Sequence, residues 1–261
     1  MGLARSSFYS CLSRKDTDNP ALLEAIRRIF RHHRGRYGYR RVTLLLKRNG
    51  FVVNHKKVQR LMRKMNLKST VRPKKYRSYI GEVGIAAPNI LDRKFHAEAP
   101  SRKWLTDVTE FRVGEKKLYL SPILDVYNGE IVSYQMHTRP DFTLVSKMLD
   151  RALRRRWKGQ LLLHSDQGWH YRHPDYRQKL RENGITQSMS RKGNCLDNAQ
   201  MESFFATLKC ECFHGQQYTS IEELEQEIHR YIRYYNHERI QGKLKGLSPV
   251  EYRTQSLVAK L

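Results

Sequence analysis

The 261-residue sequence predicts an α/β fold, in which a mixed sheet with flanking helices follows a small all-helical domain. Two observations predict this order. Apolar residues recur with helical spacing before residue 70, whereas they alternate with polar residues from Lys103 onward. Within the second region Asn128-Gly129, a dipeptide typical of hairpin turns, separates two alternating stretches, so these two strands are expected to be antiparallel.

Three short helices are expected near the start of the chain, over 21–33, over 41–49, and from a cap at Asn54 onward. The third places apolar residues on one side and basic residues on the rest of its surface. Two helices around a glycine turn, with such a second helix, indicate a helix-turn-helix-like DNA-binding domain; a small bundle with a solvated charged face is the alternative. The basic residues expected to contact DNA here are Arg40, Arg41, Lys56, Lys57 and Arg60.

Basic residues outnumber acidic ones, with 50 Lys+Arg against 25 Asp+Glu and a formal net charge of +25. A polyanion would supply the counter-charge, so DNA or RNA is the favoured partner and an anionic membrane is less favoured. No apolar run is long enough to span a bilayer. The four cysteines lack Cys-x-x-Cys spacing, so we expect reduced thiols, a cytoplasmic protein and no structural zinc site.

Strand patterns begin after residue 100. The three antiparallel strands are expected over 104–113, 118–126 and 131–137. Pro122 lies inside the second strand and indicates a bulge or a sheet edge, because proline cannot donate to a ladder. Parallel strands are expected after helical crossovers, at 160–163 and 186–189. The helices in this part of the chain are expected over 142–157, 174–183, 196–210 and 221–236.

Three carboxylates stand where this sheet would gather them at one end. Asp107 lies within the first strand, Asp166 just beyond a short apolar strand, and Glu202 on a helix face. Open α/β sheets place ligands at the carboxyl ends of their strands. Two divalent cations held by oxygen ligands can activate the attacking oxygen and stabilise the leaving oxygen of a phosphodiester. We therefore expect these three residues to be catalytic metal ligands.

Other polar residues surround the three acids. Asn198 and Lys209 share the helix face of Glu202, and His164 precedes Asp166 by two residues. His164 and Asn198 are expected to support the carboxylates, and Lys209 to contact DNA. The alternatives are a proton shuttle for His164, helix support for Asn198 and a solvated side chain for Lys209. Trp104 and Trp169 are interpreted as packing residues, with base stacking as the alternative for Trp169.

Thirty-five residues separate Asp166 from Glu202. This spacing resembles the Asp-Asp-35-Glu signature of retroviral integrases and bacterial insertion-sequence transposases. The surrounding sequence resembles the third insertion-sequence family in particular, and the resemblance extends over nearly the whole chain from about Ala21. The stretches that carry it are HSDQG at 164–168, NCLDNA at 194–199 leading to ESFF at 202–205, YYNHER at 234–239, LSP at 247–249 and GYRR at 38–41.

The resemblance implies a ribonuclease-H-like core and a DNA transposase that nicks a strand and transfers its 3′-hydroxyl. It implies two Mg²⁺ ions on Asp107, Asp166 and Glu202, with Mn²⁺ as a substitute. The implied partners are the element ends, target DNA, further copies of the chain on DNA, and an upstream-frame product fused to this one. The expected location is the bacterial cytoplasm, at the nucleoid. We expect a DNA-binding domain over 1–70, a basic linker over 71–100, the catalytic core over 101–215 and a helical extension over 216–261.

Simpler interpretations remain open at this stage. Asp107 could form a salt bridge, Asp166 an Asx-turn, and Glu202 an ion pair on its helix. The protein could also bind DNA without catalysis, or act as a nuclease of the same fold that never joins a 3′ end. A tyrosine recombinase would instead leave a covalent protein–DNA adduct.

Overall fold

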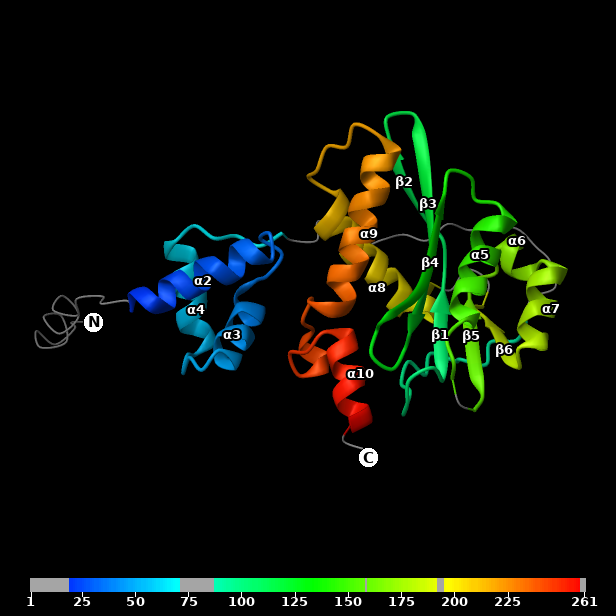
Figure 1. Ribbon diagram of the computed structural model, residues 1–261, viewed down its shortest axis with the longest axis horizontal. Helices are drawn as coiled ribbons and strands as arrows, with labels where there is room; N and C mark the ends of the chain where they lie inside the picture. Colours follow the sequence, from blue (N-terminus) through cyan, green and yellow to red (C-terminus); the bar gives the residue numbers. More distant parts are fainter. Residues whose placement is uncertain (1–18, 71–86, 158, 192–194, 259–261) are drawn as a thin grey trace, which may run out of the picture. The chain divides into compact units, whose positions relative to one another are not determined.

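The computed structural model describes residues 19–70, 87–157, 159–191 and 195–258 (Figure 1). The chain divides into two compact units, Met1–Thr70 and Val71–Leu261. Most of the expected linker, 71–86, lies outside the described residues. Within the described part of the chain, no helix is long and apolar enough to cross a membrane.

Three helices make up the first unit: α2 (Pro20–His32), α3 (Tyr39–Arg48) and α4 (His55–Lys64). The side chains of Asn19 and Asn54 cap α2 and α4 by accepting the backbone N–H of Ala21 at 3.0 Å and of Lys56 at 2.9 Å. Apolar residues of all three helices form the core of this unit: Leu22, Ile26, Val42, Leu46, Val58 and Leu61. The three expected helices are confirmed, each within about two residues of its expected bounds.

A six-stranded mixed sheet forms the centre of the second unit. Its strands are β1 (Lys103–Thr106), β2 (Thr109–Val113), β3 (Lys116–Asp125), β4 (Ile131–His137), β5 (Leu161–Ser165) and β6 (Ile185–Met189). The strand order is β2-β3-β1-β5-β6, and β4 also pairs with β3. The pairs of β3 with β1, β2 and β4 are antiparallel, whereas β1–β5 and β5–β6 are parallel. The predicted mixed sheet is confirmed.

Helices cover both faces of this sheet (Figure 1). One face carries α5 (Phe142–Leu153) and α7 (Pro174–Glu182), and the other carries α8 (Ala199–Leu208) and α9 (Ile221–His237). The shorter elements are α6 (Trp169–Arg172), η1 (Cys195–Asn198), η2 (Lys209–Phe213), η3 (Gly242–Leu244) and α10 (Pro249–Val258). The helix expected over 196–210 is present as α8, with a 3₁₀ turn directly before it and a π-helical turn directly after it. Sequence patterns missed α6, a single turn, and α10.

A continuous apolar cluster fills the space between the sheet and the α5–α7 layer. It contains Trp104 from β1 and Leu163 from β5, packed against Met148 and Leu149 of α5 and Tyr176 of α7. Trp104 is fully buried, which confirms its expected packing role. Because these strands share one rigid core, the residues at their carboxyl ends are held at fixed positions relative to one another.

The first strand is broken where the sequence predicts a continuous strand. β1 ends at Thr106 and β2 begins at Thr109, so Asp107 and Val108 lie between two ladders. Pro122 does not lie at a sheet edge, because β3 has neighbours on both sides. The expected irregularity is present, as a register shift against β4 beside Pro122, between Ile123 and Leu124.

A buried ion pair joins η2 to the end of α9. Arg239 donates from Nη2 and Nε to the two carboxylate oxygens of Glu211, at 2.5 and 2.8 Å, and Tyr231 donates its hydroxyl to Glu211 at 3.0 Å. Both charged side chains are nearly inaccessible, at 6% and 7% exposure. Since neither charge can be solvated by water, each depends on the other.

We predict that Arg239→Met lowers the free energy of unfolding of the second unit by about 3–5 kcal/mol, because it leaves Glu211 buried without its cation. Urea unfolding measures the loss. Tyr231→Phe is the control: it removes one hydrogen bond to the same carboxylate and costs about 1–3 kcal/mol. Equal losses from the two variants would contradict the ion-pair argument.

Candidate active site

The parallel register of β1 with β5 brings two of the predicted carboxylates together. Trp104 pairs with Leu163, and the following residue of each strand pairs in the same way. Carried two positions further, this register sets Asp107 directly beside Asp166. Neighbouring strands lie about 4.8 Å apart, so the two acids leave the sheet as adjacent residues at its carboxyl end.

The electrostatics of the acids agree with this placement. Burial raises the pKa of Asp107 well above its ordinary value, and the negative charges of Asp166 and then Glu202 raise it further. Burial also raises the pKa of Asp166. A like charge raises a pKa most effectively from a few ångströms away in a poorly solvated site. Asp107, Asp166 and Glu202 therefore contribute to one region of negative potential.

Both aspartates are also held by neighbouring backbone. Asp107 Oδ1 accepts the N–H of Val108 at 2.7 Å, and Asp166 Oδ1 accepts the N–H of Gly168 at 2.9 Å. The Asx-turn considered for Asp166 is thus present, and it is compatible with a role in the site. A Cβ atom at Gly168 would lie only 3.0 Å from Asp166 Oδ1 and from His170 Nε2, so any larger residue there would displace one of these two side chains by a few tenths of an ångström.

Glu202 reaches the site from the first turn of α8. Asn198, just before that helix, donates from Nδ2 to the carbonyl of Thr106 at 3.2 Å. Thr106 is the last residue of β1 and precedes Asp107. The hydrogen bond therefore fixes the start of α8 against the strand end that carries Asp107, as a positioning role for Asn198 requires.

The chemistry of these three residues suits a divalent cation. Within the described residues, no three His, Cys, Asp or Glu side chains are, as they stand, grouped closely enough to hold a metal ion. The acids nevertheless offer oxygen donors, which hard cations prefer, and burial with mutual repulsion destabilises their negative charge. A cation would relieve that repulsion, so the donor set fits Mg²⁺ or Mn²⁺ in kind and charge.

His164 is fully buried between two serine hydroxyls. Its Nδ1 lies 2.9 Å from Ser188 Oγ, and its Nε2 lies 3.0 Å from Ser190 Oγ. Burial lowers the pKa of His164 to about 4, so the ring is neutral at pH 7. A neutral imidazole with both nitrogens engaged ties β5 to β6 directly before Asp166. This geometry suits an orienting residue better than a proton shuttle.

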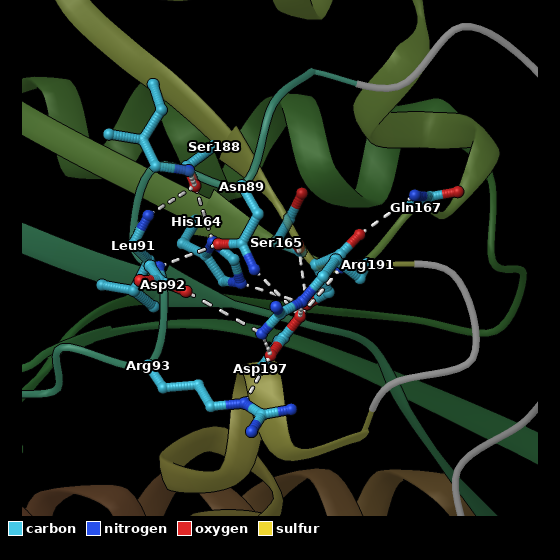
Figure 2. A network of polar contacts seen from close by, with 12 residues as sticks. Asn89, Leu91, Asp92, Arg93, His164, Ser165, Gln167, Ser188, Arg191 and Asp197 are labelled. Carbon is cyan, nitrogen blue, oxygen red and sulfur yellow. Dashed lines mark hydrogen bonds and ion pairs between the residues drawn. The ribbon is translucent and has the colours of Figure 1, made fainter.

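The centre of the surrounding polar network is Asp197, whose side chain is fully buried (Figure 2). Its carboxylate accepts hydrogen bonds from Asn89 Nδ2 at 2.9 Å and Arg93 Nε at 3.0 Å. Arg191 donates to it three times, from its backbone N–H, Nε and Nη2, at 3.0, 2.9 and 2.8 Å. The arginine interactions hold the pKa of Asp197 well below its ordinary value.

Asp197 gives the site a support that the sequence analysis did not assign. It joins residues 89–93, which precede the sheet, and Arg191, which follows β6, to the turn that starts α8. It therefore limits where α8 can begin, and with it the position of Glu202. The sequence signal was an aspartate just before a helix, which is ordinarily interpreted as a local cap and gives no indication of these distant partners.

Comparison with known proteins places the chain in a family. Residues 97–195 and 202–257 match integrase core domain families, and 17–75 match the family described as an HTH-like domain. The chain is 51% identical over 263 residues to transposase InsK of insertion sequence element IS150 from Escherichia coli, covering 99% of this chain and 93% of that protein. The chain belongs to the IS3 family of insertion-sequence transposases.

Two further similarities extend the comparison. Transposase InsF of insertion sequence IS3A from Escherichia coli is 33% identical over 234 residues, covering 87% of this chain and 80% of that protein. The integrase catalytic core domain of HTLV-2, solved in complex with magnesium, superposes with a TM-score of 0.46 at 14% identity. That superposition covers 60% of this chain and 98% of the viral domain.

Two residues near the carboxylates differ in exposure from what the sequence indicated. Lys209 is half-buried, with Nζ 5.3 Å from the ring centroid of Phe111. Burial lowers the pKa of Lys209, while the negative charges of Glu110 and Asp107 raise it, so it lies near the acids of this family member. Its contact with DNA stays a prediction. Trp169 is 52% exposed, so its interpretation as a packing residue is wrong.

The basic residues expected to bind DNA lie on α3 and α4 of the first unit. Lys56, Lys57 and Arg60 are exposed on α4, as is Arg40 on α3. Arg41 is half-buried, with its guanidinium 5.5 Å from the ring centroid of Tyr37. The exposed face of α4 therefore offers a basic surface opposite its apolar side.

We predict that Asp197→Asn lowers the free energy of unfolding at neutral pH by about 1.5–3 kcal/mol, because it removes charge-assisted hydrogen bonds. The folded pKa lies below the unfolded value of 3.8, so this stabilisation is complete above that pH and is lost as pH falls through the folded pKa. Urea unfolding of both proteins from about pH 7 to about pH 3 should show the difference shrinking at the acid end.

Asp92→Asn is the control, since Asp92 is more than half exposed and its 3.9 Å contact with Arg191 is long. It should cost less than about 1 kcal/mol. A wild-type advantage over Asp197→Asn that grows toward low pH would contradict the assignment of a lowered pKa.

Proposed function

We propose that this family member is a DNA transposase that nicks DNA at the ends of an insertion sequence and transfers the 3′-hydroxyl to target DNA. One observation carries the proposal. The β1–β5 register, whose last pair is Leu105 with His164, continues to Asp107 opposite Asp166, and the charges of Asp166 and Glu202 both raise the pKa of Asp107. That arrangement occurs in a chain whose 51%-identical relative is named as a putative transposase for an insertion sequence element.

Asp107, Asp166 and Glu202 are the residues that would hold the two Mg²⁺ ions, with Mn²⁺ as a substitute. When bound, such ions supply Lewis-acid activation of the attacking oxygen and stabilisation of the leaving oxygen in an in-line displacement. The chain itself supplies orientation: Asn198 fixes α8 to the end of β1, and His164 fixes β5 to β6. Both contacts keep the carboxylates at the same end of the sheet.

DNA binding is proposed for the first unit, chiefly through phosphates. The exposed basic side chains of α3 and α4, Arg40, Lys56, Lys57 and Arg60, with Arg41 beside them, support this role. Lys209 would contact the strand at the carboxylates. Residues 1–100 carry 24 basic and 6 acidic residues, so most of the net positive charge precedes the catalytic core. Release of counter-ions from a polyanion bound there contributes most of the affinity.

The finer organisation is proposed on the same basis. We assign a DNA-binding domain to 1–70, a linker to 71–100, the catalytic core to 101–215 and a helical extension to 216–261; the division of the chain after Thr70 supports the first boundary. An upstream-frame product fused to this chain, assembly of several copies on DNA, and action at the bacterial nucleoid complete the proposal.

We predict that Asp166→Asn and Glu202→Gln each reduce the rates of cleavage and strand transfer by more than about 100-fold. Loss of a residue that only hydrogen-bonds to a metal ligand typically costs about 10–100-fold, and loss of a ligand should cost more. DNA affinity should be nearly unchanged, because these acids do not neutralise phosphates. The measurement is a strand-transfer assay with labelled element ends and Mg²⁺, alongside a DNA-binding titration. Asp175→Asn, at a largely exposed side chain, is the control and should keep full activity. Joining at the wild-type rate by either site variant would refute the assignment.

We predict that Lys56→Ala combined with Arg60→Ala weakens DNA binding and lowers the slope of log affinity against log salt by about one unit for each phosphate that is no longer neutralised. Titrations at several salt concentrations measure both effects. Arg233→Ala, at an exposed position of α9 in the other unit, removes charge without touching α4. An equal decrease in affinity for Arg233→Ala would show that overall charge, and not the α4 surface, determines the affinity.

A further inference from the structure

Pro122 lies opposite Asp107 in the sheet. β1 pairs with β3 through Thr106 and Ile123 as its last pair, and β2 pairs with β3 in a continuation of the same register. The two positions skipped between these ladders are Asp107 and Val108. In the continuing register, Asp107 faces Pro122. β1 and β2 are thus one strand whose hydrogen-bonded ladder is interrupted at the proposed catalytic aspartate.

The strand geometry shows toward which neighbouring strand the backbone nitrogen of Pro122 points. Val126 donates its N–H to the carbonyl of Lys103, the residue before the first β1–β3 pair, at 2.9 Å. Along an antiparallel strand, alternate residues direct their N–H groups to the same neighbour. Pro122 therefore faces the strand of Asp107 with its nitrogen, and proline has no hydrogen there to donate. The missing donor accounts for the interruption.

A proline at this position is costly. β3 is paired on both sides, and proline in such a strand removes a ladder hydrogen bond that other residues would supply. Residues that break a local structural rule tend to mark functional sites. The interruption coincides with Asp107, the residue that the β1–β5 register carries opposite Asp166, so the lost hydrogen bond lies at the proposed metal site.

We propose that Pro122 is a positioning residue for Asp107, and this rests on the proposed function. Without a donor from Pro122, the backbone at Asp107 is not held in the ladder that a continuous strand would impose. The carboxylate can then take the orientation in which it accepts the N–H of Val108 at 2.7 Å, on a residue that the β1–β5 register carries opposite Asp166. A residue that donates at position 122 would close the ladder and turn Asp107 away from that orientation.

The test is Pro122→Ala in the full chain, with Pro122→Val, a strong strand former, as a second variant. Closing the ladder should protect the new amide at position 122 from hydrogen exchange and raise the melting temperature, without metal or DNA present. The strand-transfer rate at saturating DNA should fall by about 10–100-fold, the range typical of residues that orient metal ligands. DNA affinity should not change. Greater stability with lower activity is an outcome that a purely structural proline would not give.

Two matched controls isolate the missing donor. Lactic acid incorporated at position 122 keeps the alanine side chain but replaces the amide by an ester with no N–H, so it should restore the wild-type rate. Pro140→Ala makes the same substitution at an exposed loop position and should change nothing. If the ester variant is as slow as Pro122→Ala, loss of the ring and not gain of a donor is responsible, and the proposal fails.

The outcomes separate the two proposals. Rapid exchange at residue 122 in both variants would show that the ladder does not close, which overturns the role of Pro122. Wild-type joining rates with a closed ladder would overturn it as well. Absence of strand transfer by the wild-type protein fused to its upstream product would instead overturn the proposed function.

Discussion

The site depends on the parallel pairing of β1 with β5. This pairing is set deep in the core, where Trp104 and Leu163 are register partners and are almost completely buried. A slip of one residue would send every core side chain of a strand to the opposite face, so the apolar packing specifies the register strongly. The same register then places Asp107 and Asp166 side by side. The position of the acids is thus decided by apolar residues that take no part in chemistry.

Holding two buried carboxylates together costs free energy, because burial and like charge both disfavour ionisation. The surrounding structure offsets this cost with contacts that do not add negative charge at the acids. His164 is neutral and engaged at both nitrogens, and Asn198 ties α8 to β1 through an amide. Asp197 carries a charge, but two arginines neutralise it. The groups that hold the carboxylates in place are therefore neutral or paired with an opposite charge. The negative potential of the site then arises from the three candidate metal ligands alone.

The helices of the first unit combine a small apolar core with a basic surface. Their apolar faces form a small core, while the exposed face of α4 carries Lys56, Lys57 and Arg60. Positive charge gathered on one surface attracts a polyanion without requiring a shaped cavity. In the second unit negative charge is concentrated at the candidate carboxylates. Under the proposed function a negatively charged DNA strand would approach these carboxylates, and bound cations would offset the repulsion between them.

The sequence by itself determined the local features. Caps at Asn19 and Asn54, the strand alternation and the spacing of Asp166 and Glu202 are encoded within short stretches, and they were enough to indicate the fold class and the family. Only the tertiary structure decided that Asp197 is buried at the centre of a polar network, that Trp169 is exposed and that Pro122 lies opposite Asp107 in the continuing β1–β3 register. These facts depend on which distant segments become neighbours. Local periodicity sets the face on which a side chain lies, but pairing between remote strands and helices decides what that face meets.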